Sequence, residues 1–271
     1  MQTDQALVAL LSLYFLVPLA AAGSTVVFVA GDDSNLYTIN PPTGATTLIG
    51  PMGIEMSDIA ARNGLMYGIS FPPSGPSRLY SINEQTAAAT PIGASLGAFL
   101  NGLQFGPDGT LYASGGDSLY RVNTSTGVAS LIGSGTGAGM YDSSGDLEFV
   151  GNTMYLTSLL SMATDQLFTI DPTTGQGTLI GNIGYPSVYG LADPNGVMYG
   201  FNTVGNHVLS ISLVTGAATP VSTYSAAFHI LGAAEDSSRV TAAPEPGTLG
   251  AMVLGLALVA KLATKHRRQS L

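Results

Sequence analysis

Short hydrophobic and polar segments alternate along the central part of the chain in a pattern that occurs five times. One segment, rich in Leu, Tyr and Ile, ends in a polar turn and is followed by a segment that usually ends in Ile-Gly. The copies of this pair begin at Leu36, Leu79, Leu119, Leu167 and Val208. Their turn positions are Gly44, Ala87, Gly127, Gly175 and Gly216, spaced 43, 40, 48 and 41 residues apart. Such segments, bounded by Gly, Asn, Asp or Pro, are typical of β-strands joined by hairpins.

Two more strand-like segments precede each copy. The nearer one begins at Val26, Leu65, Thr110, Thr153 and Val197, and the weaker, farther one at Ser57, Asn101, Gly145, Tyr189 and Leu231. We name the four predicted strands A to D in chain order, A being the weaker segment and D the one that ends in Ile-Gly. Four-stranded units repeated every 40 to 50 residues or so predict the blades of a β-propeller.

The ends of the repeat predict how the ring closes. The chain enters at strand B, near Val26, and leaves at strand A, near Leu231. We therefore predict an all-β protein with five four-stranded blades, in which the last strand A completes the first blade and removes an open edge. A β-solenoid is the structural alternative, although its repeats are usually shorter. We divide the chain into an N-terminal signal segment (residues 1–22), the propeller (residues 23–240) and a C-terminal segment (residues 241–271).

The repeat resembles the Thr-Gly type of secreted β-propeller, a group that includes a domain of unknown function common in exported proteins. It is less similar to quinoprotein propellers, whose repeats also carry a Thr-Gly turn. Those repeats use a docking Trp, and this chain has no Trp.

The N-terminus carries an apolar run from Ala6 to Ala22 that closes on three alanines. A run of this length with small residues at its end predicts the helix and cleavage site of a secretory signal peptide. The segment before it is atypical, because it holds Asp4 and no Lys or Arg. A buried N-terminal helix is the alternative.

The C-terminus combines three features. They are, in order, the tripeptide Pro244, Glu245 and Pro246, an apolar stretch over residues 249–260, and a basic end that contains Lys265, Arg267 and Arg268. An apolar helix followed by cations is a stop-transfer pattern, and it predicts a transmembrane helix with its basic end on the cytoplasmic side. An ordinary terminal anchor helix is the alternative reading, with nearly the same localisation.

These three features resemble the PEP-CTERM sorting signal. The resemblance implies export in a Gram-negative bacterium, a membrane-anchored intermediate held by the C-terminal helix, and processing by an exosortase-type enzyme. It further implies a final place at the cell surface or outside the cell, and an association with exopolysaccharide. The signal is an address and does not define an activity.

Composition narrows the function classes. The 271 residues contain no Cys, which excludes a disulfide scaffold, a thiolate metal site and a cysteine nucleophile. Residues 23–243 carry 4 Arg against 15 Asp and Glu, a net charge of −11, which argues against a nucleic-acid partner. The sequence Gly93–Gly97 matches G-x-S-x-G, but no helix is predicted after it, as a nucleophile elbow requires.

Six aromatic residues lie outside the repeat pattern, in or at the ends of the predicted D–A loops. They are Tyr141, Tyr185, Tyr189, Tyr224, Phe99 and Phe228. We predict that they collect on one face, where aromatic rings suit sugar stacking or a protein interface. The alternative is that they fill the central funnel as plugs.

Acidic residues are predicted on the same face: Glu55, Asp58, Asp142, Asp146 and Glu148. Asp58 and Asp146 take the same strand A position that glycine fills in other blades, and we include both in the predicted binding site. Paired carboxylates also permit glycosidase chemistry, and Asp32–Asn35 or Asp142–Glu148 permit a calcium site. His207 and His229 lack metal-ligand spacing and are predicted to be surface residues.

These observations favour a non-enzymatic exported propeller that binds or organises polysaccharide or another surface protein. We predict no catalytic residue, no metal and no cofactor. A propeller-type glycan hydrolase or lyase, and a purely structural matrix protein, are the alternatives.

Overall fold

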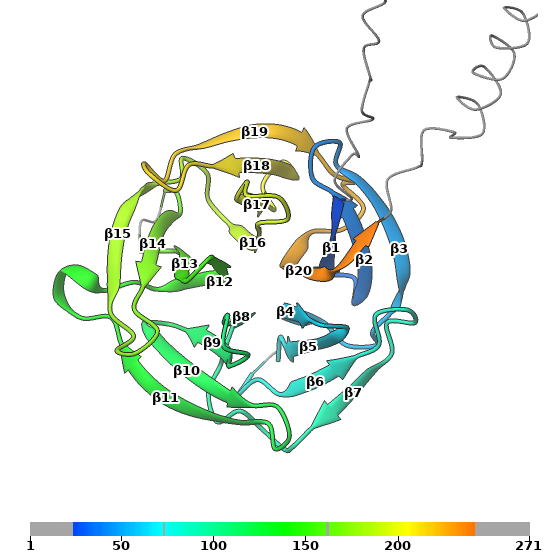
Figure 1. Ribbon diagram of the computed structural model, residues 1–271, viewed down its shortest axis with the longest axis horizontal. Helices are drawn as coiled ribbons and strands as arrows, with labels where there is room; N and C mark the ends of the chain where they lie inside the picture. Colours follow the sequence, from blue (N-terminus) through cyan, green and yellow to red (C-terminus); the bar gives the residue numbers. More distant parts are fainter. Residues whose placement is uncertain (1–23, 73, 161–162, 242–271) are drawn as a thin grey trace, which may run out of the picture. The chain divides into compact units, whose positions relative to one another are not determined.

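The computed structural model describes residues 24–72, 74–160 and 163–241, which form five four-stranded antiparallel sheets around a common centre (Figure 1). This confirms the predicted five-bladed β-propeller. The predicted signal peptide and the predicted sorting segment lie outside the described residues.

The first two blades contain the two ends of the described chain and the strands that follow. Blade 1 contains β20 (Ile230–Thr241), β1 (Ser24–Gly31), β2 (Asn35–Asn40) and β3 (Ala45–Pro51). Blade 2 contains β4 (Met56–Arg62), β5 (Leu65–Ser70), β6 (Leu79–Ile82) and β7 (Ala89–Ile92). In every blade the strands follow the predicted order A to D, and strand A lies nearest the centre (Figure 1).

The other three blades follow in chain order. Blade 3 contains β8 (Gly102–Phe105), β9 (Leu111–Gly115), β10 (Ser118–Asn123) and β11 (Val128–Ser134). Blade 4 contains β12 (Ser143–Val150), β13 (Thr153–Ser158), β14 (Gln166–Ile170) and β15 (Gly177–Asn182). Blade 5 contains β16 (Val188–Ala192), β17 (Tyr199–Asn202), β18 (His207–Ile211) and β19 (Ala218–Thr223). Within the described ranges the one helix is η1 (Gly137–Gly139), and none is long and apolar enough to span a membrane.

The ring closes through the pairing of β1 with β20, as predicted. The ladder runs from Ser24 opposite Thr241 to Gly31 opposite Ile230, with two register shifts. Residues 24–241 make up one compact unit, and this unit contains every blade together with the pair of strands that closes it.

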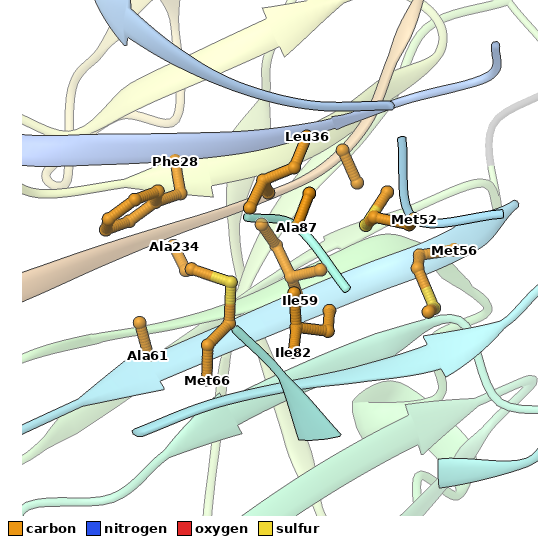
Figure 2. Packing of buried hydrophobic residues seen from close by; sticks show 11 residues of the cluster. Phe28, Leu36, Met52, Met56, Ile59, Ala61, Met66, Ile82, Ala87 and Ala234 are labelled. Carbon is orange, nitrogen blue, oxygen red and sulfur yellow. The ribbon is translucent and has the colours of Figure 1, made fainter. Parts of the chain in front are cut away.

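Five hydrophobic clusters lie between neighbouring blades. Figure 2 shows the one between blades 1 and 2, where Leu36 of β2, Ile59 of β4 and Met66 of β5 interdigitate with no more than 2% of each side chain exposed. The alternation of strands A, B and C supplies these residues, because every second side chain points to the same face of a blade. Each blade thus buries its two faces against its two neighbours.

The turn between strands C and D has a local cause in the sequence. Each turn begins with a polar residue that ends strand C; at Asn123, for example, the side-chain oxygen accepts the backbone N–H groups of Ser125 and Thr126 at 2.9 and 3.0 Å. Gly127 then takes a φ of 66° and donates its N–H to the Asn123 carbonyl at 2.8 Å. Asn, Asp and Ser favour such turns, and glycine tolerates the positive φ.

The same turns join the blades at their outer edge. A Cβ on Gly133 of β11 would lie 2.0 Å from the carbonyl oxygen of Thr174, in the C–D turn of the next blade. Gly93 and Thr126, and Gly181 and Thr215, are related in the same way at 2.0 and 2.1 Å. The glycine of each Ile-Gly pair therefore permits backbone-to-backbone packing between blades.

Two positions depart from this rule. Ala87 replaces the turn glycine in blade 2 at a φ of 60°, and its methyl group is fully buried. Ser222 replaces the strand D glycine in blade 5, and its hydroxyl donates to the Pro41 carbonyl of blade 1 at 2.6 Å. This hydrogen bond accompanies close packing at the blade 5 to blade 1 contact, where a Cβ on Gly44 would lie 2.0 Å from the Thr223 carbonyl oxygen.

Gly133→Ala is expected to lower the free energy of unfolding by about 2 kcal/mol, because the added methyl overlaps the Thr174 carbonyl. Gly50→Ala is the matched control, because a Cβ on Gly50 would lie 3.0 Å from its nearest atom, the Thr86 carbonyl oxygen. This substitution should therefore lower the free energy of unfolding by less. Chemical denaturation of residues 24–241 measures both. Equal losses would contradict the proposed role of the glycine.

Candidate functional site

The centre of the propeller is a channel lined by the five inner strands, and one position on each strand controls its width. The residues at this position are Asp58, Gly102, Asp146, Gly190 and Gly232. A Cβ on Gly232 would lie 2.3 Å from Oδ1 of Asp58. Gly232 therefore leaves room for Asp58, and the two aspartates fill the middle of the channel.

Asp58 and Asp146 are both fully buried, and their carboxyl groups lie close enough to interact with each other. Two buried carboxyl groups this close repel each other when both are ionised, so the pair is stable when it shares a proton. Burial raises the pKa of each well above its usual range, and the charge of Asp58 raises that of Asp146 further. The Asp58 carboxyl also accepts the N–H of Leu103 at 2.6 Å, and that of Asp146 accepts the N–H of Leu191 at 2.5 Å.

These bonds connect four blades, because Asp58 and Asp146 belong to blades 2 and 4 while their backbone donors belong to blades 3 and 5. The pair lies mid-channel, away from the face on which the sequence placed it. We therefore correct that expectation: these aspartates hold the inner strands together and are enclosed by protein.

One mouth of the channel opens between the A–B turns into a cavity of about 360 Å³, which we name the acidic cavity. Glu148 accepts the Gln104 amide at 2.8 Å and the Phe149 N–H at 2.6 Å, and Glu235 accepts the Asp193 N–H at 3.1 Å. The Glu148 and Glu235 carboxyl groups lie close enough to interact electrostatically. The prediction that Glu148 faces the D–A loops is wrong, since it lines the opposite mouth.

Burial dominates the electrostatics of the acidic cavity. Loss of water raises the pKa of Glu235 from 4.5 to about 7, and the pKa of Glu148 is raised by burial and by the nearby Glu235 charge. Arg62 also lines this mouth, but its guanidinium donates to the carbonyls of Gly106 and Pro107. The carboxyl groups are therefore not neutralised by that arginine.

The other mouth opens between the D–A and B–C loops into a cavity of about 300 Å³, which we name the aromatic cavity. It is lined by Glu55, Ser57, Phe71, Phe99, Asn101, Ser144, Gly145, Leu159, Tyr189 and Leu231. Phe71 and Phe99 are 46% and 44% exposed and meet edge to face, with ring centroids 5.7 Å apart and planes at 80°. This mouth lies on the face predicted to bind ligand.

The polar side chains of the aromatic cavity are held in place by the backbone. Asn101 donates an amide hydrogen to the Ser143 carbonyl at 2.7 Å, while its side-chain oxygen is buried without a hydrogen-bond partner. The Ser57 hydroxyl donates toward the carbonyls of Ile69 and Leu100 at 3.2 and 3.1 Å. Burial and the Asp32 charge raise the pKa of Glu55.

The structure divides the six predicted aromatic residues. Phe99 and Tyr189 line the aromatic cavity. Tyr141, Tyr224 and Phe228 are at most 5% exposed and belong to the hydrophobic clusters, so the expectation that all six rings collect on one ligand-binding face is corrected. Tyr185 is half-buried against the core between blades 4 and 5 and meets His207 edge to face at 5.9 Å.

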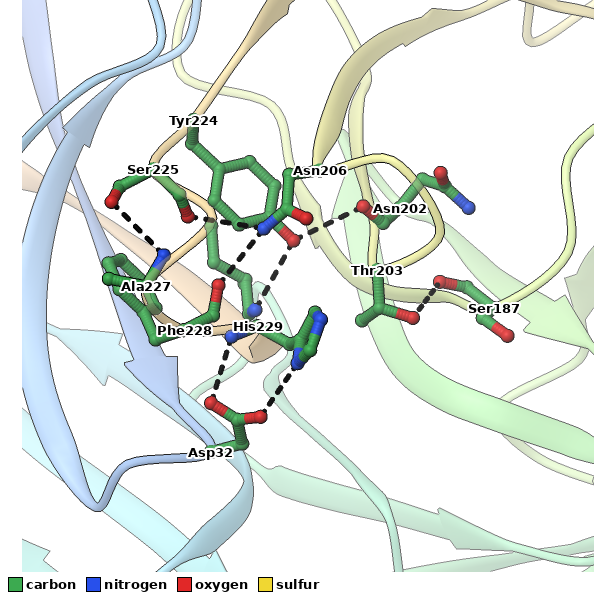
Figure 3. A network of polar contacts seen from close by, with 11 residues as sticks. Asp32, Ser187, Asn202, Thr203, Asn206, Tyr224, Ser225, Ala227, Phe228 and His229 are labelled. Atoms are coloured by element: carbon green, nitrogen blue, oxygen red, sulfur yellow. Dashed lines mark hydrogen bonds and ion pairs between the residues drawn. The ribbon is translucent and has the colours of Figure 1, made fainter.

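Two of these rings support the seam of the propeller, as Figure 3 shows. The hydroxyl of Tyr224 donates to the Asn202 carbonyl at 3.1 Å and accepts the N–H of Ile230, the first residue of β20. Phe228 stacks on Tyr37 with ring centroids 4.1 Å apart. They stabilise the start of the closing strand, and because their sequence context matches the other loop aromatics, the sequence did not distinguish them.

The same seam carries an ion pair between Asp32 and His229 (Figure 3). The His229 ring nitrogen Nδ1 lies 2.7 Å from the Asp32 carboxylate, and its backbone N–H donates to the same group at 2.8 Å. His229 remains 48% exposed, which confirms the prediction of a surface residue.

Sequence reasoning missed several lining residues of both cavities. Phe71 follows strand B of blade 2 and Leu159 follows strand B of blade 4, so both lie in B–C loops that open onto the aromatic cavity. A hydrophobic residue directly after strand B was the available signal. Asp193 and Glu235 were missed because their position at the acidic cavity depends on the closed ring.

Within residues 24–72, 74–160 and 163–241, no group of three or more His, Asp or Glu residues is arranged to hold a metal ion. At the first candidate calcium segment, Asp33 accepts the Tyr37 hydroxyl at 2.6 Å and the Asn35 amide at 2.8 Å, as a turn residue does. Gly93–Gly97 lies between β7 and β8 with no helix after it, and Ser95 caps the N–H of Gly97 at 3.0 Å.

No family model and no curated protein sequence matches the chain. Among solved structures, a protein of unknown function from Bacteroides thetaiotaomicron is 15% identical with a TM-score of 0.51, over 74% of this chain and 58% of that one. The PQQ-bound aldose sugar dehydrogenase from Streptomyces coelicolor is 17% identical with a TM-score of 0.46, over 72% of this chain and 76% of that one. At 15% identity, the likeness to the first of these two proteins shows the fold alone.

Stability should fall as the pH rises from about 5 to 8, because the buried carboxyl groups hold protons in the folded state that the unfolded chain releases. The contribution of Glu235 is complete below its ordinary pKa of 4.5 and is lost as the pH passes about 7. Thermal melts across this range test the trend, and Glu235→Gln should flatten it. A profile that rises with pH in the wild type would contradict it.

Asp146→Ala is expected to lower the free energy of unfolding by about 3 kcal/mol, because it leaves Asp58 and the Leu191 N–H without their partner. Asp146→Asn supplies an N–H to Asp58 and an oxygen to Leu191, so its loss should be about 1 kcal/mol or less. Guanidinium titration of both variants provides the comparison. Similar losses would indicate that the shared proton is not what holds the strands together.

Proposed function

We propose that this chain is an exported, non-enzymatic binding propeller whose aromatic cavity takes one unit of an extracellular polysaccharide. The observation that carries the proposal is the open mouth lined by Phe71, Phe99 and Tyr189 beside polar side chains. Aromatic faces stack on the apolar faces of sugars, while nearby acceptors orient the hydroxyl groups.

Export and localisation rest on the two ends of the sequence. The apolar run before residue 23 supports secretion, and the tail that begins at Pro244 supports sorting by an exosortase-type enzyme after a membrane-anchored stage. The final location we propose is the cell surface or the extracellular matrix of a Gram-negative bacterium.

Binding is favoured over glycan hydrolysis because of where the carboxyl groups lie. Of the three carboxyl groups that this alternative could use, Asp58 and Asp146 are enclosed mid-channel, and Glu148 lines the opposite mouth. A hydrolase needs both groups beside a sugar bond and room for water. A structural matrix role without a ligand does not account for exposed rings at a cavity mouth.

A glycan array of residues 23–243, with bound sugars checked for cleavage by mass spectrometry, tests the function directly. We expect specific binding without cleavage. Cleavage of a bound sugar would favour the hydrolase alternative, and binding to no sugar would favour a structural or protein-binding role.

Phe99→Ala and Tyr189→Ala should each weaken the binding of the best sugar about tenfold, because each removes a stacking face. Tyr141→Phe is the control: it removes a hydroxyl that is buried without a partner, so neither binding nor the fold should change. Calorimetric titration gives the affinities. Unchanged binding in the Phe99 and Tyr189 variants would remove the aromatic cavity from the site.

A further inference from the structure

The polar groups of the aromatic cavity offer acceptors to a ligand and few donors. The Ser57 hydroxyl directs its proton to backbone carbonyls, and the Ser144 hydroxyl donates to Asp165 at 2.7 Å. The side-chain oxygen of Asn101 is buried and unpartnered, and Glu55 in its ionised form only accepts. The cavity therefore favours a ligand group that consists of donors.

The charge of the residues that line the aromatic cavity also favours a cationic donor group. None of its lining residues is Lys, Arg or His, and Asp32 lies close enough to Glu55 to raise its pKa. His229 is paired with Asp32 and not with Glu55. A cation bound beside Glu55 would stabilise its carboxylate, whereas an anion there would be repelled.

The aromatic rings complete the arrangement. Phe71 and Phe99 stand nearly perpendicular, and the Phe71 N–H donates to the Glu55 carbonyl at 3.0 Å, which fixes the aromatic pair next to the carboxylate residue. Rings in this relation can surround a cation with their negative faces. Tyr189 adds a third ring to the lining of the same cavity.

We propose that the aromatic cavity recognises the ammonium group of an amino sugar that carries a free amine. The inference rests on the proposed function and narrows its ligand class. The sugar ring stacks on the exposed aromatic side chains, while the ammonium group faces the Glu55 carboxylate. An N-acetylated amino sugar lacks the charge and replaces two donors with a carbonyl acceptor.

The test is calorimetric titration of residues 24–241, the compact unit, with a β-1,4-linked glucosamine tetramer and its fully N-acetylated counterpart. We expect the free-amine tetramer to bind about tenfold more tightly. Glu55→Gln should remove this preference. Asp108→Asn, which removes an equal charge from an exposed turn outside the cavity, should preserve it.

Two results would overturn the inference and leave polysaccharide binding in place. These are equal affinity for the two tetramers, or a preference that falls equally in the Glu55 and Asp108 variants. Equally tight binding of a tetralysine peptide would also overturn it, because the cavity would then bind ammonium groups whether or not a sugar carries them. Failure to bind any sugar, on the array or in solution, would count against the proposed function itself.

Discussion

The close approach of the five inner strands at the channel centre determines how the rest of the propeller is organised. Three strands meet this constraint with glycine, and a side chain at Gly232 would collide with Asp58. The other two place the side chains of Asp58 and Asp146 at this centre, where one shared proton makes the buried pair tolerable. The resulting plug separates the channel into two mouths of different chemistry, one acidic and one aromatic.

The sequence carries enough information for the fold because each blade repeats its own local signals. Polar residues such as Asn123 end strand C, the following Gly127 accepts a positive φ, and alternation marks the buried faces. The sequence could not explain the glycine that ends strand D. Gly133 is required there because it packs against the carbonyl group of Thr174 in the next blade, 41 residues away in the chain. Contacts of this kind exist only once the ring has formed.

The candidate site was predicted less completely, because a loop position does not say which way a side chain turns. Tyr224 and Phe228 have the same sequence context as Phe99, yet they pack beneath the closing strand while Phe99 remains exposed. Glu148 follows Asp146 by two residues and so points to the same side of its strand, but it reaches the opposite mouth. Strand A runs from the D–A loop to the A–B turn, so Glu148, near the end of β12, lies at the A–B mouth.

The seam between β1 and β20 has a mechanical consequence. Ser24 and Thr241 are paired directly, so the chain segments that precede and follow the propeller leave from the same end of one ladder. A force that pulls these segments apart would act nearly parallel to the interstrand hydrogen bonds and open them one pair at a time, as a zipper opens. The β1–β20 ladder would then open at a lower force than if the same two strands were pulled from opposite ends. Tension on one of the two segments alone would not pull the strands apart in this way.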